Sequence, residues 1–157
     1  MQYIDRETTR LRPPKRGSVP LRKPQGVMLH CTGGKHSSDL ARSMMIVRQV
    51  QAYHQSKGWK DAGYHWFVDD AGNVLEGRGW DVRGSHAGAK YNATHHACAY
   101  LGDGKSPTPE ALDAIGRVLA EHESRYGTSD HRGHCEVTRK SCPGPGVMAW
   151  LRVRRGH

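Results

Sequence analysis

Short apolar runs alternate with longer segments of helical periodicity along most of this 157-residue chain. Residues 27–29 form an apolar run typical of a buried strand, and residues 43–57 repeat apolar side chains at the spacing of an amphipathic helix. Residues 65–76 contain two apolar segments separated by turn-forming residues, which predicts a β-hairpin. A further strand is expected at residues 97–101, followed by a helix at residues 108–127. This order predicts a single-domain α/β fold with a mixed central sheet flanked by helices.

The second long helix has the clearest boundaries of the predicted elements. Thr108 is a favourable N-cap, Pro109 suits the first helical position, and Gly127 provides a C-terminal stop. A last short helix is expected at residues 147–153. The glycine-rich segment at residues 78–94 is expected to be a loop.

The first 25 residues differ in composition from the rest of the chain. Prolines at positions 13, 14, 20 and 24 exclude a long helix there. Many basic residues cluster in the same segment: Arg10, Arg12, Lys15, Arg16, Arg22 and Lys23. We therefore expect residues 1–25 to be an irregular basic extension and residues 26–157 to be the folded domain.

The net charge of the chain is +9, so polyanions such as nucleic acid, anionic lipid headgroups or bacterial cell wall are all compatible partners. No apolar run approaches the roughly 18 residues of a membrane span. The polar, proline-rich start does not resemble a signal peptide. We therefore expect synthesis in a reducing cytoplasm, where the four cysteines are free thiols or metal ligands rather than disulfides.

One pair among the many histidines and cysteines has the spacing of a metal site. His134 and Cys142 stand in a segment expected to be a loop, where they can converge on one zinc ion, which accepts imidazole nitrogen and thiolate sulfur. His30, at the end of the first predicted strand, is the candidate third ligand. Three protein ligands leave a fourth position open, as in catalytic zinc sites. Taken alone, such a pair is more often a loop histidine and a buried cysteine.

Four segments of the chain, in order, carry a likeness to a known family. They are Leu29–Thr32; Gly63–Phe67 with Asp70–Val74 and Glu76–Arg78; Gly84–Ala87 with Tyr91 and Asn92; and Gly133–Val137 with Lys140–Gly144. Through these segments, residues 26–152 resemble the type 2 N-acetylmuramoyl-L-alanine amidases, a family that includes phage amidase-lysozymes and peptidoglycan recognition proteins. The resemblance implies the amidase fold, one Zn²⁺ per chain, and bacterial peptidoglycan as the partner.

The resemblance also implies roles for individual residues. It makes His30, His134 and Cys142 the zinc ligands and gives catalytic roles to Tyr64 and Lys140. A lysine ammonium can stabilise the negative charge that builds on the amide oxygen as the amide becomes tetrahedral. A tyrosine hydroxyl can orient water or hydrogen-bond the intermediate. Without the family context, the tyrosine would be interpreted as a packing residue and the lysine as a solvated charge.

Other residues are candidates for contacts to the substrate. His86 and Asn92 lie in the segment that lines the substrate groove in the family, and His65 is either a groove residue or a packed strand residue. Cys31 should point away from His30 on a regular strand and belong to the core rather than to the ligand set.

Three further positions leave alternatives open. His95 and His96 depart from the family pattern, and they either alter the groove or offer a second metal site. Trp80 either stacks on a sugar ring or packs beneath the loop.

The expected activity is hydrolysis of the amide bond between the lactyl group of N-acetylmuramic acid and L-alanine. The protein is expected to be a monomeric phage or prophage endolysin, made in the host cytoplasm and acting on the cell wall after release. The alternative is a module that binds peptidoglycan without cutting it, but such modules often lack the cysteine ligand, and Cys142 is present. Neither membrane insertion nor nucleic-acid binding is expected, because no nucleic-acid motif accompanies the basic residues.

Overall fold

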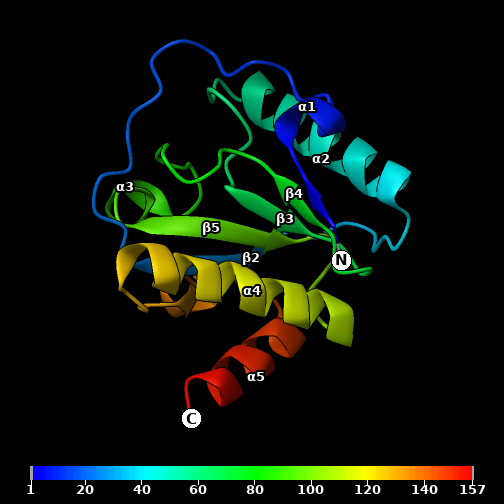
Figure 1. The fold of residues 1–157 in the computed structure, drawn as a ribbon, viewed down its shortest axis with the longest axis vertical. Helices are drawn as coiled ribbons and strands as arrows, with labels where there is room; N and C mark the ends of the chain where they lie inside the picture. The colour runs from blue at the N-terminus through cyan, green and yellow to red at the C-terminus, as the bar shows by residue number, and fades with distance from the viewer. Residues whose placement is uncertain (1, 157) are drawn as a thin grey trace.

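The computed structural model describes residues 2–156 and contains a six-stranded sheet with helices on both faces (Figure 1). In sheet order, the strands are β1 (Tyr3–Ile4), β4 (Val74–Glu76), β3 (Trp66–Val68), β5 (His95–Tyr100), β2 (Gly26–Cys31) and β6 (Arg132–Gly133). Neighbouring strands are parallel, apart from the antiparallel hairpin of β3 and β4. This mixed sheet confirms the predicted α/β fold.

The helices are distributed over the two faces of the sheet. They are α1 (Arg6–Thr9), α2 (Leu40–Ser56), α3 (Gly88–Asn92), α4 (Pro109–Tyr126) and α5 (Pro145–Arg154), and a short 3-10 turn, η1 (His134–Glu136), follows β6. α2 and α1 cover one face, whereas α4 covers the other, with α5 beyond it (Figure 1). Within residues 2–156, no helix has the length and apolar character needed to cross a membrane.

Strand alternation divides the core between the two faces of the sheet. Leu29 packs with Leu119 of α4 on one face, and Phe67 packs with Val47 of α2 on the other. All four side chains are fully buried, and burial of each contributes about 1.5–3 kcal/mol. Successive strand residues face opposite sides of the sheet. His30, the residue after Leu29, therefore faces the side covered by α2.

The ends of the two long helices are determined by residues next to them in the sequence. The Thr108 hydroxyl caps α4 by accepting the N–H of Ala111 at 3.1 Å, and Gly127 ends the helix with a left-handed φ of 67°, which confirms the predicted boundaries. α2 begins at Leu40, three residues earlier than predicted, because the Asp39 carboxylate accepts the N–H of Arg42 at 2.8 Å.

Two short regular elements lie within the segment that the sequence predicts to be an irregular N-terminal extension. Tyr3–Ile4 adds a parallel strand beside β4, and Arg6–Thr9 forms one helical turn. Ile4 is buried in the α2-side core, and the Arg6 guanidinium lies 2.9 Å from the buried Asp61 carboxylate. These long-range contacts order a segment whose local composition favours no element. The predicted loop at residues 78–94 is likewise interrupted by α3.

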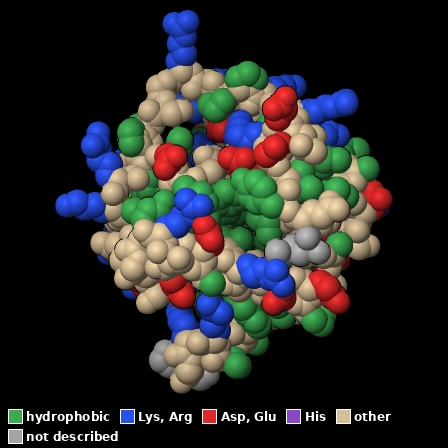
Figure 2. All heavy atoms as spheres, viewed as in Figure 1, with side chains coloured by type: hydrophobic (Ala, Val, Ile, Leu, Met, Phe, Trp, Pro, Cys, Tyr) green, Lys and Arg blue, Asp and Glu red, His purple; other side chains and the backbone are tan. Residues whose placement is uncertain are grey.

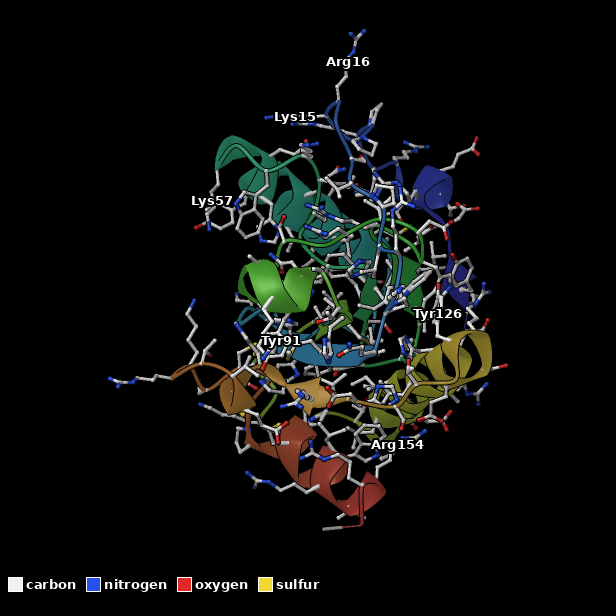
Figure 3. The ribbon with its side chains drawn as sticks, turned by 90° about the vertical axis from the view of Figure 1, so that its left-hand side faces the viewer. Lys15, Arg16, Lys57, Tyr91, Tyr126 and Arg154 are labelled. Carbon is white, nitrogen blue, oxygen red and sulfur yellow. The ribbon has the colours of Figure 1, made fainter. Side chains whose placement is uncertain are left out.

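The basic residues visible on one face of the molecule are spread around it rather than gathered in one place. On the face drawn in Figure 2, Lys and Arg side chains project around the edge of the molecule, with Asp and Glu side chains between them. Arg16 extends away from the body of the protein at one end (Figure 3), whereas the neighbouring Lys15 ammonium group donates to the Gln55 carbonyl oxygen at 3.0 Å. On the viewed face, the charge of the chain therefore does not form one continuous basic patch.

Several imidazoles are buried away from the predicted zinc ligands at the end of β2, and they make stability depend on pH. Burial lowers the pKa of His54 and His96 to about 4 and that of His122 to about 3, from an ordinary value near 6.5. His96 and His122 face each other with their Nδ1 atoms 3.1 Å apart. Below pH 6.5 the unfolded chain binds protons at these positions that the folded protein does not bind, so acid favours unfolding.

We therefore expect the contribution of these imidazoles to the free energy of unfolding to be constant above about pH 7 and to fall by several kcal/mol, to order of magnitude, between pH 6.5 and 4. Urea titrations at a series of pH values, with a chelator in every sample to exclude metal effects, measure this directly. The variant His96→Gln, which retains a donor for the Trp80 carbonyl oxygen, should flatten the curve. A free energy of unfolding that does not change between pH 7 and 4.5 would contradict the prediction.

Candidate metal centre

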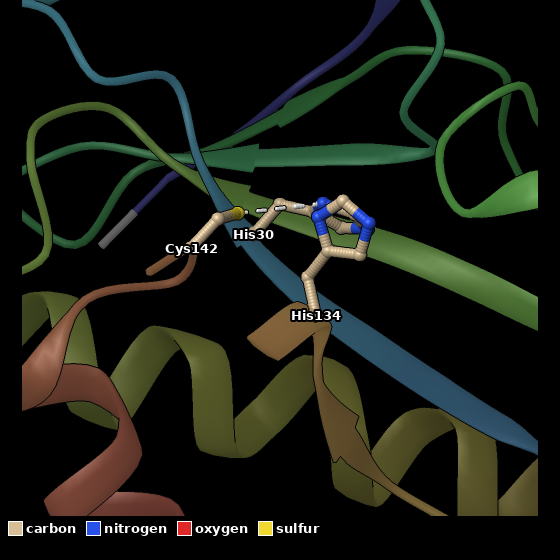
Figure 4. A group of neighbouring side chains, drawn as sticks. All are labelled: His30, His134 and Cys142. Atoms are coloured by element: carbon tan, nitrogen blue, oxygen red, sulfur yellow. Dashed lines mark hydrogen bonds between the residues drawn. The ribbon is translucent and has the colours of Figure 1, made fainter. Parts of the chain in front are cut away.

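Three side chains from separate segments converge at the end of β2 (Figure 4). His30 stands near the end of β2, His134 begins η1, and Cys142 lies in the loop before α5. One potential ligand atom from each lies within 4.8 Å of the others, and the His30 Nδ1 is 3.6 Å from the Cys142 Sγ. Two imidazole nitrogens and one sulfur form a donor set that suits tetrahedral zinc with one position open.

The sheet register explains why residues distant in sequence meet here. β2 and β6 pair in parallel, with Leu29 opposite Gly133. The residues that follow these two, His30 in β2 and His134 at the start of η1, therefore become neighbours. Their ring centroids are 4.5 Å apart. A Cβ atom at Gly133 would lie 2.0 Å from the Met148 sulfur, so any side chain at this position requires the buried Met148 side chain to shift.

The electrostatic surroundings favour neutral imidazoles at this centre. Burial is the main cause that lowers the pKa of both His30 and His134, so both rings are unprotonated at neutral pH and can donate a lone pair. The pKa of the Cys142 thiol is raised, first by its hydrogen bond with the Cys31 side chain and then by burial. Metal binding must therefore displace the thiol proton, as thiolate ligation requires.

Cys31 only partly follows expectation. It is absent from the group of three potential ligands, as predicted. It is half-buried rather than part of the core, and its backbone N–H donates to the Cys142 Sγ at 3.3 Å. The end of β2 thus supports Cys142 through its backbone while supplying His30 as a ligand.

A groove of about 590 Å³ opens beside the metal centre. Its lining includes the predicted residues His86, Asn92, His134 and Lys140, together with Lys57, Trp59, Ser85, Ala87, Gly88 and Thr138. Lys140 is exposed at the groove, and the half-buried Tyr64 ring lies 5.0 Å from the His30 ring. The structure therefore brings both predicted catalytic side chains to the centre. Burial raises the pKa of Tyr64, which keeps its hydroxyl protonated.

Lys57 and Trp59 are groove residues that were not predicted from the sequence. Lys57 follows α2, and its ammonium group lies 4.5 Å from the centroid of the Trp59 ring, a cation–π distance. An aromatic residue directly after Gly58, shortly before Tyr64, was the available signal.

His65 is a packed strand residue, which resolves the two alternatives left open for it and excludes the groove contact. Its side chain is fully buried, its Nε2 donates to the Val82 carbonyl oxygen at 2.7 Å, and its Nδ1 accepts the N–H of Ala97 at 2.8 Å. Trp80 packs against Trp66 and His96, with ring centroids 4.8 Å and 4.9 Å away.

His95 and His96 belong to no second group of potential metal ligands among residues 2–156. They are adjacent on β5 and point to opposite faces of the sheet. His95 contacts the Asp130 carbonyl oxygen at 2.9 Å, whereas His96 contacts His122. Both imidazoles are thereby used in packing contacts.

Comparisons with known proteins agree with this geometry. The model of the N-acetylmuramoyl-L-alanine amidase family matches residues 20–145. The chain is 33% identical to peptidoglycan-recognition protein SC1a/b of Drosophila simulans, covering 81% of this chain and 70% of that protein. It is 30% identical to the endolysin of Enterobacteria phage K11, covering 80% and 83%.

Solved structures of peptidoglycan recognition proteins share the fold. Wild-type Drosophila PGRP-LB superposes with a TM-score of 0.89 at 26% identity, covering 96% of this chain and 92% of that one. Peptidoglycan recognition protein LE, solved in complex with tracheal cytotoxin, a monomeric diaminopimelic acid-type peptidoglycan, gives a TM-score of 0.88 at 26% identity, covering 96% and 92%. The extent of the family match, supported by these relatives, shows that the chain belongs to the N-acetylmuramoyl-L-alanine amidase family.

Proposed function

We propose that this protein is a zinc-dependent N-acetylmuramoyl-L-alanine amidase that hydrolyses the lactyl–L-alanine amide bond of peptidoglycan. The observation that carries the proposal is the convergence of His30, His134 and Cys142 within 4.8 Å beside an open groove. We further propose that the enzyme is a monomeric phage or prophage endolysin whose catalytic part is residues 26–157. The similarity to phage endolysins supports this setting.

Each side chain at the groove has a distinct task in this proposal. Zinc held by the three ligands would activate water and polarise the scissile carbonyl group. Lys140, exposed at the groove, places a positive charge where negative charge develops on the amide oxygen. Tyr64 keeps its proton and can donate a hydrogen bond to the reacting groups. The groove holds the glycan and stem peptide on either side of the bond.

The second candidate function is a recognition module that binds peptidoglycan without cleaving it. Its support is the likeness to peptidoglycan recognition proteins, some of which were solved with a bound peptidoglycan fragment. The complete donor set of two imidazoles and one thiol favours catalysis, because binding a glycopeptide needs no open metal position.

Product analysis on purified peptidoglycan separates the two functions. The zinc-loaded protein should release new L-alanine amino termini without new reducing sugar ends, and a chelator should stop the release. A protein that sediments with peptidoglycan but releases no amino termini with or without zinc is a recognition module. New reducing ends would instead indicate a glycosidase.

A further inference from the structure

His86, which the sequence places among the substrate contacts, touches a zinc-ligand candidate directly. Its Nδ1 lies 3.0 Å from the His30 Nε2, and its Nε2 lies 3.1 Å from the backbone carbonyl oxygen of His95. We infer that His86 is a positioning residue that holds His30 in the tautomer and orientation needed for zinc. This inference rests on the proposed zinc site.

The direction of each hydrogen bond follows from the backbone carbonyl group of His95, the last member of this series of hydrogen-bonded groups. A carbonyl oxygen only accepts, so the His86 Nε2 carries the proton and donates to His95. The Nδ1 of a neutral His86 therefore has a free lone pair and accepts the N–H of the His30 Nε2. His30 is left with its lone pair on Nδ1, the atom that faces the Cys142 sulfur at 3.6 Å. The backbone of β5 thus determines which nitrogen of His30 meets the metal.

Asn92 extends the same support to the backbone of the loop. Its Oδ1 accepts the N–H groups of His86 at 2.8 Å and of Ala87 at 2.9 Å. One amide oxygen therefore ties the end of α3 to the loop that carries His86. Asn92 thus fixes the backbone of His86, and the His86 side chain in turn fixes the imidazole of His30.

Zinc-bound histidines in proteins usually donate their second N–H to a carboxylate, a carbonyl oxygen or water, and loss of that partner lowers metal affinity about 10- to 100-fold. Here a second imidazole takes this place, and it is itself oriented by a backbone carbonyl group. Although His86 also lines the groove, a pure substrate contact would affect the KM for peptidoglycan and leave zinc affinity unchanged.

The test compares the zinc affinity of three variants in the absence of substrate. His86→Leu removes the acceptor for His30. In His86→Asn, the Oδ1 stands near the position of the lost Nδ1 and can accept the same N–H. The matched control is His65→Leu, because His65 is a neighbouring buried imidazole with two backbone partners and no hydrogen bond to a ligand candidate. Zinc affinity is measured by competition with a chelator of known affinity, and urea unfolding of the zinc-free proteins reports stability separately.

We expect His86→Leu to bind zinc about 10- to 100-fold more weakly, and His86→Asn to recover most of that loss. His65→Leu should lower the stability of the zinc-free protein while the folded fraction keeps its zinc affinity. Asn92→Ala, which retains both imidazoles, provides a second route if His86→Leu does not fold, and it should weaken zinc binding to a smaller extent.

Two results would overturn the inference. One is a folded His86→Leu protein, or an Asn92→Ala protein in its place, with the zinc affinity of the parent. The other is an equal loss of affinity in His86→Leu and His65→Leu, which would indicate general loosening of the core. A different result would contradict the proposed amidase function without affecting the role of His86: a protein that binds zinc tightly but releases no amino termini from peptidoglycan.

Discussion

Replacing Cys142 with serine is expected to abolish both zinc binding and amidase activity. A ligand must lose its proton to bind zinc, and a serine hydroxyl stays protonated at neutral pH where a metal-paired thiol does not. The variant retains only the two imidazoles of His30 and His134, a set too small to hold a catalytic zinc ion. Zinc content after gel filtration and release of L-alanine amino termini measure the two losses.

Cys135→Ser is the matched control for this substitution. Cys135 is a half-buried thiol in the neighbouring turn, but it is not among the three potential ligands. Its replacement should leave the zinc content at one ion per chain. A Cys142→Ser protein that still carries zinc and cleaves peptidoglycan would exclude Cys142 from the metal centre. Equal losses in both variants would point to unfolding rather than to ligation.

Replacing Lys140 with alanine is expected to lower kcat about 100- to 1,000-fold, the usual effect of removing one group that stabilises developing oxyanion charge. Zinc affinity and stability should stay near those of the parent, because Lys140 is exposed at the groove and belongs neither to the donor set nor to the core. Steady-state kinetics on solubilised peptidoglycan, with zinc content and thermal unfolding recorded in parallel, separates these effects.

Arg139→Ala removes an adjacent exposed positive charge that does not line the groove. It should change the rate little, and any effect should disappear as salt rises, since exposed charges are screened. A Lys140→Ala enzyme with a near-normal kcat would remove Lys140 from the mechanism. A similar loss in both variants would assign the effect to the general basic charge near the groove.

The sequence anticipated best those features that are encoded by neighbouring residues. The ends of α4 follow from Thr108 and Gly127, whose effects act within one helical turn. The N-terminal strand β1 was harder to predict from the sequence, because it forms only where Tyr3 and Ile4 pair with the edge of β4, about 70 residues away. Contacts at such separation leave no periodicity in the local sequence.

The candidate site shows the same division. Family motifs identified His30, His134 and Cys142, and the structure brings them together. The same motifs suggested substrate contacts for His65 and His86, where the structure shows a packed imidazole in one case and a partner of His30 in the other. A motif states which residue types recur, whereas the direction of each hydrogen bond depends on the atoms that surround the side chain.

The sequence by itself determined the α/β fold, the family and the chemistry of the three donor atoms, since these depend on residue type, local periodicity and motif order. Only the tertiary structure decided how the donors meet, because the register of β2 with β6 sets His30 beside His134. It also decided that the carbonyl oxygen of His95, acting through His86, selects the nitrogen that His30 presents. Hydrogen bonds of this kind are set by distance and direction between segments that the linear sequence keeps apart.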